Sequence, residues 1–379
     1  MVTHRSSGRN IWLAPAVVWL LSCASPPESL LGSWPEFRAL PLIPSGVHPN
    51  TLVVSDLDRD GDLDIAVPAV LDTSVLVLRN QGDGTFERIS TTPWDAGALD
   101  AAVADLDGDG AVEIVATTFA DNRVLALSAR AGGTFEVTGN VAVEGEPTCL
   151  ALADVVGDRS LDLLVTRGQE NDMWLFEGDS AGDFTLAETV SLARRPTAMA
   201  VADFDGDGAS DIAVVSSIAN ELAILSRHAG DARYQVRATA PLSGWPASLL
   251  PLDLDRDGEL ELVGATNLGD SLFIAEFSRA LGGGLAIHVR EQEAGYGSFG
   301  VAAADFDRDG WIDLAVTDKF ADTVTLFQNI EGELEPRVSY PTGGGPTPVE
   351  AADFDGDGIA DLVVANGFSN DISLFLSSR

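Results

Sequence analysis

The chain has 379 residues, of which 22 are Lys or Arg and 59 are Asp or Glu, so that its formal net charge is −37 at pH 7. This acidity disfavours binding to nucleic acids or anionic lipids through a basic surface. The charge alone would suggest disorder, but 45% of the residues are hydrophobic and form regular Val, Ile and Leu runs, which predicts a folded protein.

The N-terminal segment is typical of an export signal. Arg5 and Arg9 precede the apolar run "IWLAPAVVWLLS", which is short for a membrane span. The run ends in "LLSC", which resembles the lipobox of bacterial lipoproteins, in which Cys23 would become the lipidated first residue. This resemblance implies a signal peptide over residues 1–22, a linker over residues 23–34 and a lipid anchor at the outer membrane or surface of a bacterial cell. If Cys23 is incidental, the segment is an ordinary secretory signal and the protein is secreted.

Beyond the linker, a nine-residue acidic motif occurs seven times. The intact copies are "DLDRDGDLD" from Asp56, "DLDGDGAVE" from Asp105, "DFDGDGASD" from Asp203, "DLDRDGELE" from Asp253, "DFDRDGWID" from Asp305 and "DFDGDGIAD" from Asp353. The third copy along the chain, "DVVGDRSLD" from Asp154, is degenerate. Successive copies begin 49, 49, 49, 50, 52 and 48 residues apart. Such a fixed period indicates a repeat fold rather than several unrelated domains.

Each repeat predicts four short strands. An Ala-rich apolar run leads into the acidic loop, and a β-branched run such as "IAVV" follows the loop. A third run such as "VTLFQN" comes after an Asx-containing turn, and a fourth such as "TFERIS" after a Gly-rich turn. Four short strands per repeat of about 50 residues are typical of a β-propeller blade.

The last repeat contains only three predicted strands before the chain ends at Arg379. Residues 36–43, "EFRALPLI", precede the first repeat and resemble the missing fourth strand. A ring closed in this way leaves no exposed edge strand. The sequence therefore predicts an all-β, seven-bladed β-propeller over residues 35–379, with four-stranded blades and an N-terminal strand that completes the last blade.

The acidic loops resemble those of the FG-GAP/VCBS repeat family, the calcium-loop propellers related to the integrin α-subunit head. The signatures of the WD40 and kelch repeats, which have similar periods, are missing. In each loop, positions 1, 3, 5 and 9 offer carboxylates and position 7 a backbone carbonyl, while Gly at position 6 permits the sharp turn. All-oxygen ligands indicate a hard cation, and several flexible carboxylates favour Ca²⁺ over Mg²⁺.

An Asp-rich turn that holds no ion is the alternative interpretation, but six copies in one register argue against it. The predicted Ca²⁺ ligands are Asp56, Asp58, Asp60, Asp62, Asp64, Asp105, Asp107, Asp109, Ala111, Glu113, Asp203, Asp205, Asp207, Ala209, Asp211, Asp253, Asp255, Asp257, Glu259, Glu261, Asp305, Asp307, Asp309, Trp311, Asp313, Asp353, Asp355, Asp357, Ile359 and Asp361. In the third repeat Val156 replaces an Asp and Arg159 replaces the Gly, and we expect the Arg159 cation to substitute for the ion. About six calcium sites are predicted.

A second candidate site lies on the face opposite the calcium loops. These loops join the first and second strands, so the connections between strands 2 and 3, and between one blade and the next, lie on the other face. The side chains at the inter-blade connections vary while the scaffold repeats, as expected of a binding site, although ordinary loop variation is an alternative. The predicted ligand-face residues are His48, Trp94, Glu146, Arg194, Arg195, Trp245 and Tyr296.

No catalytic motif is evident, because the chain has no G-x-S-x-G elbow, H-E-x-x-H helix or phosphate-binding Gly loop. We therefore interpret the protein as a calcium-binding, envelope-anchored binding or adhesion module. Aromatic and Arg side chains would suit a glycan or a protein segment as ligand. The alternatives are a calcium-dependent lyase or hydrolase acting on polysaccharide, and a purely structural lipoprotein.

Overall fold

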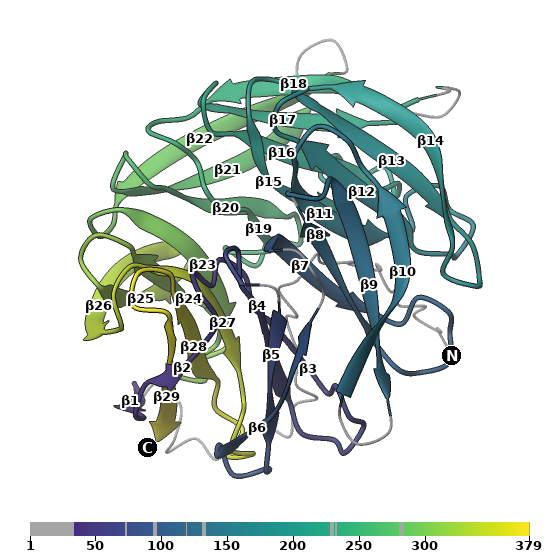
Figure 1. Ribbon diagram of the computed structural model, residues 1–379. Coiled ribbons are helices and arrows are strands. Elements are labelled where there is room, and N and C mark those ends of the chain that lie inside the picture. Colours follow the sequence, from purple (N-terminus) through teal and green to yellow (C-terminus); the bar gives the residue numbers. More distant parts are fainter. Residues whose placement is uncertain are drawn as a thin grey trace, which may run out of the picture.

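The computed structural model describes residues 34–378 apart from 73, 94–96, 119, 131–133, 228–230, 232 and 280–283. Seven antiparallel sheets are arranged in a ring, as Figure 1 shows, and no helix occurs among these residues. No described segment therefore meets the length and hydropathy of a membrane-spanning helix. The expected signal peptide, Cys23 and Trp94 lie outside the described residues.

Each sheet is one blade, and its strands pair in chain order. Blade 1 consists of β3 (Val53–Ser55), β4 (Asp64–Pro68), β5 (Ser74–Asn80) and β6 (Phe86–Pro93). Blade 2 consists of β7 (Ala98–Ala104), β8 (Glu113–Thr118), β9 (Arg123–Arg130) and β10 (Thr134–Ala142). Blade 3 consists of β11 (Pro147–Ala153), β12 (Asp162–Arg167), β13 (Asp172–Gly178) and β14 (Phe184–Ser191). Blade 4 consists of β15 (Pro196–Ala202), β16 (Asp211–Ser216), β17 (Glu221–Ser226) and β18 (Gln235–Pro241). Blade 5 consists of β19 (Leu250–Leu252), β20 (Glu261–Thr266), β21 (Ser271–Arg279) and β22 (Leu285–Glu293).

Blade 6 consists of β23 (Ser298–Ala304), β24 (Asp313–Asp318), β25 (Thr323–Ile330) and β26 (Glu333–Pro341). Blade 7 consists of β27 (Pro346–Ala352), β28 (Asp361–Asn366), β29 (Asp371–Ser378) and β1 (Glu36–Ala39), with β2 (Ile43–Pro44) also paired to β29. The predicted all-β propeller of seven four-stranded blades is therefore confirmed, and so is its closure by an N-terminal strand.

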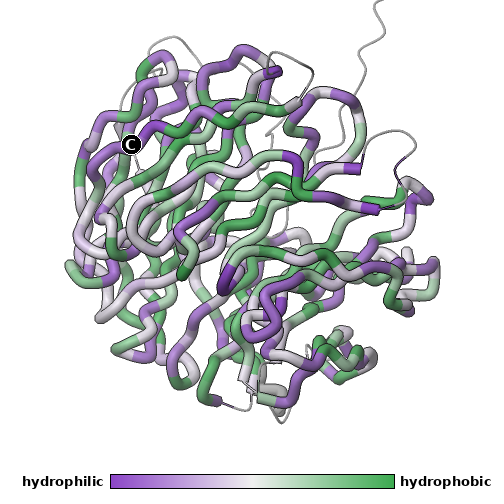
Figure 2. The backbone as a smooth tube through the Cα atoms, turned by 90° about the horizontal axis from the view of Figure 1, so that it is seen from above, coloured by the Kyte–Doolittle hydropathy of each residue, from purple (hydrophilic) through white to green (hydrophobic). Residues whose placement is uncertain are grey.

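The second strand of each blade is buried on both faces, whereas the fourth strand is largely exposed. Strand β16, "DIAVVS", is buried along its whole length, while β10, "TFEVTGNVA", alternates and is mostly exposed. Hydrophobic stretches follow the strands and hydrophilic ones the connections, as Figure 2 shows from above. A continuous β-branched run therefore marks a strand between two neighbouring blades, and an alternating run marks the rim.

The hydrophobic core is divided into clusters that lie between blades. One cluster joins Val53 and Ala66 of blade 1 to Ile114 and Ala116 of blade 2. The apolar residue at position 2 of most acidic loops enters these clusters, and Phe306 and Phe354 are almost completely buried there. Each blade thus depends on its two neighbours for the burial of its faces.

Strand β1 completes the ring by pairing with β29 in the register Phe37↔Ser377. Phe37 is only 8% exposed, and its ring lies 5.7 Å from that of Phe306 and 5.6 Å from that of Tyr340, both in blade 6. The N-terminal strand therefore packs against blade 6 as well as pairing within blade 7.

We expect Phe37→Ala to lower the free energy of unfolding by about 3–5 kcal/mol, because it leaves a cavity between blades 6 and 7. Leu42→Ala is the matched control, since Leu42 is 49% exposed and its truncation should change stability by less than about 0.5 kcal/mol. Urea unfolding of the two variants checks this. Equal midpoints would show that the N-terminal strand adds nothing to the closure of the ring.

Candidate functional site

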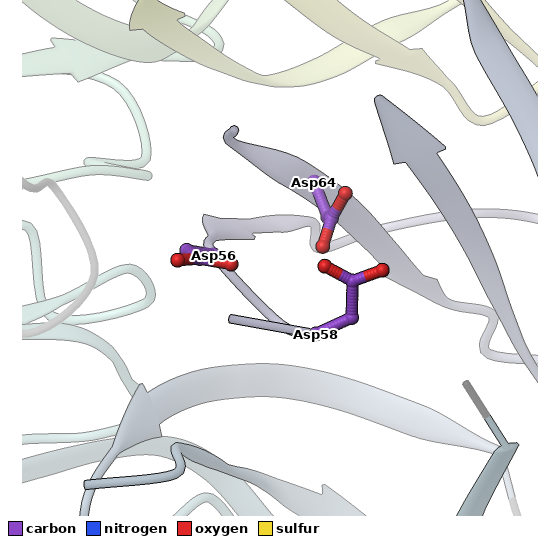
Figure 3. Close-up of side chains that lie close together, drawn as sticks. All are labelled: Asp56, Asp58 and Asp64. Carbon is purple, nitrogen blue, oxygen red and sulfur yellow. The ribbon is translucent and has the colours of Figure 1, made fainter. Parts of the chain in front are cut away.

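Among the described residues, six groups of three or more potential metal-ligating side chains lie close together, and at least five of them are carboxylates of the acidic loops. Within each group one oxygen of every carboxylate lies within 4.8 Å of the others. Five groups consist of positions 1, 3 and 9 of a loop: Asp56, Asp58, Asp64; Asp105, Asp107, Glu113; Asp203, Asp205, Asp211; Asp253, Asp255, Glu261; and Asp305, Asp307, Asp313. Figure 3 shows the first group, in which the Asp58 and Asp64 carboxylates point toward one another beside Asp56.

The predicted ligands at positions 5 and 7 are held by a local hydrogen bond. In each intact loop the position-5 carboxylate accepts the backbone N–H of position 7, at 2.6 to 3.0 Å. The position-1 carboxylate accepts the N–H of position 6, at 2.8 to 3.1 Å. Position 6 favours glycine because its φ is positive, for example +89° at Gly208.

Position 9 is the first residue of the second strand in each blade, and it connects the acidic loop to that blade. Its carboxylate accepts the N–H of position 2 in all seven loops, at 2.7 to 3.0 Å. In four blades the other oxygen accepts an N–H from the end of the third strand, as Asp313 does from Asn329 at 2.8 Å. This position therefore has a structural role besides any role in metal binding.

Asn329 and its counterpart Asn80 extend this link to a second blade, which the sequence analysis missed. The Asn329 side-chain amide donates to the Leu254 carbonyl of blade 5, and that of Asn80 to the Phe354 carbonyl of blade 7, both at 2.8 Å. The two asparagines stand at the same offset from position 1 of their loops. This shared position in two repeats was the sequence signal that could have revealed the link between blades.

Burial raises the pKa of the position-9 carboxyls far above their ordinary values. Desolvation is the largest cause, and neighbouring carboxylates add to it. The pKa rises to about 6 for Asp64, to about 7 for Asp211, Glu261 and Asp361, and to about 8 for Asp313. Without a cation, these carboxyl groups therefore hold a proton over much of the neutral range.

The degenerate third loop keeps this hydrogen-bonded scaffold but lacks the carboxylate at position 3. Asp154 accepts the N–H of Arg159 at 2.9 Å, and Asp162 accepts that of Val155 at 2.8 Å. Val156 packs against an apolar cluster instead of offering a carboxylate. The Arg159 side chain is exposed and is seen in no ion pair with a described carboxylate, so its substitution for the ion stays a prediction. Its backbone occupies the glycine conformation, at φ 80°.

The opposite face is built on a second recurring motif. His48, Glu146, Arg195 and Trp245 all have left-handed φ values, between 59° and 63°. Each donates its backbone N–H to an Asn side chain in the preceding blade, as Trp245 does to Asn220 at 2.8 Å. Non-glycine residues in this conformation cost about 1 kcal/mol or more each, and the hydrogen bond to the Asn side chain helps to hold each of them there.

One half of this face carries charged side chains, and two of its arginines form ion pairs with carboxylates of the same face. Arg195 forms an ion pair with Glu146 at 2.9 Å, and Arg167 forms one with Asp172 at 2.6 Å. Arg194 is exposed nearby. The guanidinium of Arg195 therefore already has a carboxylate partner from a neighbouring inter-blade connection.

The other half is apolar and extends over blades 5, 6, 7 and 1. Trp245 is 48% exposed and Tyr296 is 62% exposed. The Tyr296 ring lies 5.4 Å from that of Phe320, and His48 stacks on Phe368 at 6.5 Å. The sequence analysis missed the turns between strands 2 and 3, whose exposed apolar residues are Leu71, Ile218, Leu268, Phe320 and Phe368. The sequence signal that could have revealed them is an apolar residue one or two positions before an Asx residue in these five turns.

Comparison with known proteins supports the repeat assignment. The FG-GAP-like repeat model matches residues 56–116, 154–214, 203–264 and 305–364, which is more than half of the chain. No curated protein matches the sequence significantly.

Solved structures show the same fold at low identity. The chain resembles BBS1N in its complex with ARL6DN, with 11% identity, a TM-score of 0.62, and coverage of 90% of this chain and 97% of that one. It also resembles a catalytically inactive virginiamycin B lyase from Staphylococcus aureus with quinupristin, with 14% identity, a TM-score of 0.58, and coverage of 90% and 99%. A protein from Lactobacillus plantarum has 14% identity and a TM-score of 0.59, with coverage of 79% and 86%. From the repeated acidic loops, the seven-bladed ring and the family match, the chain belongs to the FG-GAP-like repeat family.

Proposed function

We propose that this FG-GAP-like propeller is a calcium-stabilised binding module whose face opposite the acidic loops takes a glycan or protein ligand. The observation that carries the proposal is the difference between the two faces of the propeller disc. Carboxylate groups converge on one face, and most of the exposed large hydrophobic side chains lie on the other. Attachment to the bacterial envelope through Cys23 is part of the same proposal and rests on the N-terminal sequence.

The donor set of the loops supports a hard cation. Each of the five named groups supplies carboxylate oxygens from positions 1, 3 and 9, and position 5 lies in the same turn. Three buried oxygens in these groups accept no hydrogen bond from a described residue: Asp211 Oδ1, Asp253 Oδ1 and Asp305 Oδ1. A buried carboxylate oxygen without a partner costs free energy unless a cation or proton satisfies it. Calcium suits a flexible set of several carboxylates better than magnesium does.

The apolar half of the opposite face supports a ligand site. Monomeric proteins rarely expose several large aromatic side chains side by side without an interaction to which they contribute. Both BBS1N and the lyase are described with a bound molecule, ARL6DN in one case and quinupristin in the other. Propellers of this shape thus serve as binding scaffolds, and we extend that role to this chain.

An enzyme is less well supported. A catalytic pair would require an acid and a base within hydrogen-bonding reach of a common substrate. Among the described residues, no hydrogen bond or ion pair joins His48 or Tyr296 to Glu146, and Glu146 is committed to Arg195. Nor does a purely structural role account for the exposed aromatic cluster.

We expect the purified protein to bind six calcium ions and to lose thermal stability when EDTA removes them, because the carboxylate groups then repel one another. Val156→Asp combined with Arg159→Gly should add a seventh site, since it restores positions 3 and 6 of the third loop. Calorimetric titration counts the sites. A wild-type count of seven, or a melting temperature that EDTA leaves unchanged, would contradict the assignment.

The position-9 carboxyls have folded-state pKa values of about 6 to 8, above their unfolded values. In the calcium-free protein their protonation stabilises the fold at low pH, and this contribution is lost as pH rises through those values. Calcium binds the ionised carboxylates, so the stability that calcium contributes increases as pH rises.

The rise in melting temperature on adding calcium should therefore be larger at about pH 8 than at about pH 5.5, while the calcium-free protein is less stable at the higher pH. Thermal unfolding in EDTA and in calcium at both values measures the four conditions. An equal gain at the two pH values would show that protons and calcium do not compete for these carboxylates.

Once a glycan array identifies a ligand, Trp245→Ala should weaken its binding by about 30-fold or more, since aromatic anchors often contribute about 2 kcal/mol. Leu186→Ala is the matched control, because Leu186 is also an exposed apolar residue but lies on the outer strand β14. Wild-type affinity in the Trp245 variant, with calcium-dependent stability intact, would place the site elsewhere on the disc.

A further inference from the structure

Lys319 is the only lysine in the chain. It follows β24 directly and lies in the turn between the second and third strands of blade 6, on the ligand face. Its backbone N–H donates to the Gly297 carbonyl at 2.9 Å, which fixes the turn beside Tyr296. The lysine therefore belongs to the apolar half of the face, between blades 6 and 7.

The Lys319 ammonium lies against aromatic rings. Its Nζ is 4.5 Å from the centroid of Phe299, on the innermost strand of blade 6, and 5.5 Å from that of Phe368, in the corresponding turn of blade 7. Phe368 is 56% exposed. The cation is thus partly buried between two rings, at a place that solvent and a ligand still reach, and each ring attracts it through its π face.

No described carboxylate lies within ion-pair distance of Lys319. The adjacent Asp318 is buried, and its carboxylate accepts hydrogen bonds from Thr325 at 2.5 Å, Thr323 at 3.0 Å and Ser298 at 3.4 Å. The chain has 59 acidic residues against 22 basic ones, so the missing partner does not reflect a shortage of carboxylates. On the same face, Arg195 and Arg167 are both paired.

Desolvation lowers the pKa of Lys319, and no neighbouring charge opposes this shift. A partly buried ammonium without a counter-ion is destabilised relative to one in water. An anionic group that entered from solvent would remove this penalty and form a charge-assisted hydrogen bond in a site of reduced dielectric.

We propose that Lys319 binds the carboxylate of an acidic sugar residue, while the exposed rings of Tyr296 and Phe368 contact the sugar ring. This inference rests on the proposed ligand face and names the chemistry of its ligand. The rings favour a saccharide because a pyranose presents a flat C–H surface to an aromatic side chain. A single carboxylate is favoured over a polyanion because the net charge of −37 repels further negative charge beyond the first contact.

The single lysine permits a selective test. Reductive ¹³C-methylation keeps the charge and labels one side chain, so that the dimethyl-Lys319 resonance can be followed by NMR apart from that of the α-amine. The probes are cellobiouronic acid, which carries one carboxylate, its neutral analogue cellobiose, and a tripeptide with one glutamate and blocked ends. We expect cellobiouronic acid to shift the resonance saturably and to bind about tenfold or more tightly than cellobiose, as a charge-assisted hydrogen bond of about 1.5–3 kcal/mol requires.

Three other results would overturn the inference, each in a different way. Equal affinity for cellobiouronic acid and cellobiose would leave the ligand face intact but refute carboxylate recognition. A shift with the tripeptide alone would show that the anion comes from a protein ligand. No shift with any probe, in a protein whose tryptophan fluorescence also stays unchanged, would refute the acidic-sugar site and count against the ligand face as well.

Substitutions of Lys319 distinguish the effect of losing its charge from an effect on folding. Lys319→Met should weaken binding of cellobiouronic acid about tenfold or more without changing that of cellobiose, and Lys319→Arg should retain most of the affinity. Arg337→Gln is the matched control, because Arg337 also lies over an aromatic ring, that of Trp34, but on the rim of the same blade. Unchanged affinity in Lys319→Met, at an unchanged urea midpoint, would refute the role of the lysine.

Discussion

Each blade of this propeller is apolar on both faces, and this constraint governs the rest of the structure. A four-stranded sheet with buried residues on both sides, such as β16 and its neighbours, has no stable form in isolation. Its faces can be covered only by two further blades, and the last blade can be covered only if the ring closes. The core is accordingly a circle of clusters between blades rather than one central cluster.

The acidic loops solve a geometric problem at one end of this ring. The chain must turn sharply between the innermost strand and the buried second strand, where backbone N–H groups would otherwise lack partners. The carboxylates of positions 1, 5 and 9 accept those N–H groups in every loop, including the degenerate third one. The same carboxylates then repel one another, and burial raises the pKa of position 9. A cation at this point would resolve the repulsion without disturbing the hydrogen bonds.

The opposite face combines a constant backbone with variable side chains. At six of the seven inter-blade connections a left-handed residue donates its backbone N–H to an Asx side chain in the preceding blade, so the connection keeps its shape whatever its side chain is. The side chains are therefore free to differ around the ring. In blades 2 to 4 they form ion pairs, and from blade 5 to blade 1 they expose aromatic and aliphatic groups around the single lysine.

The sequence by itself determined the number of blades, the order of their strands, the closing N-terminal strand and the positions of the acidic loops. These features depend on short-range periodicity and on a motif repeated at a constant interval, both of which are local properties of the chain. Only the tertiary structure decided which charges on the ligand face are paired. Arg195 meets Glu146 49 positions away, and Lys319 reaches the Phe368 ring of the next blade without meeting a carboxylate. Such contacts arise where neighbouring blades bring equivalent turns together, and the distance between two side chains there is set by the packing of whole blades rather than by their spacing in the sequence.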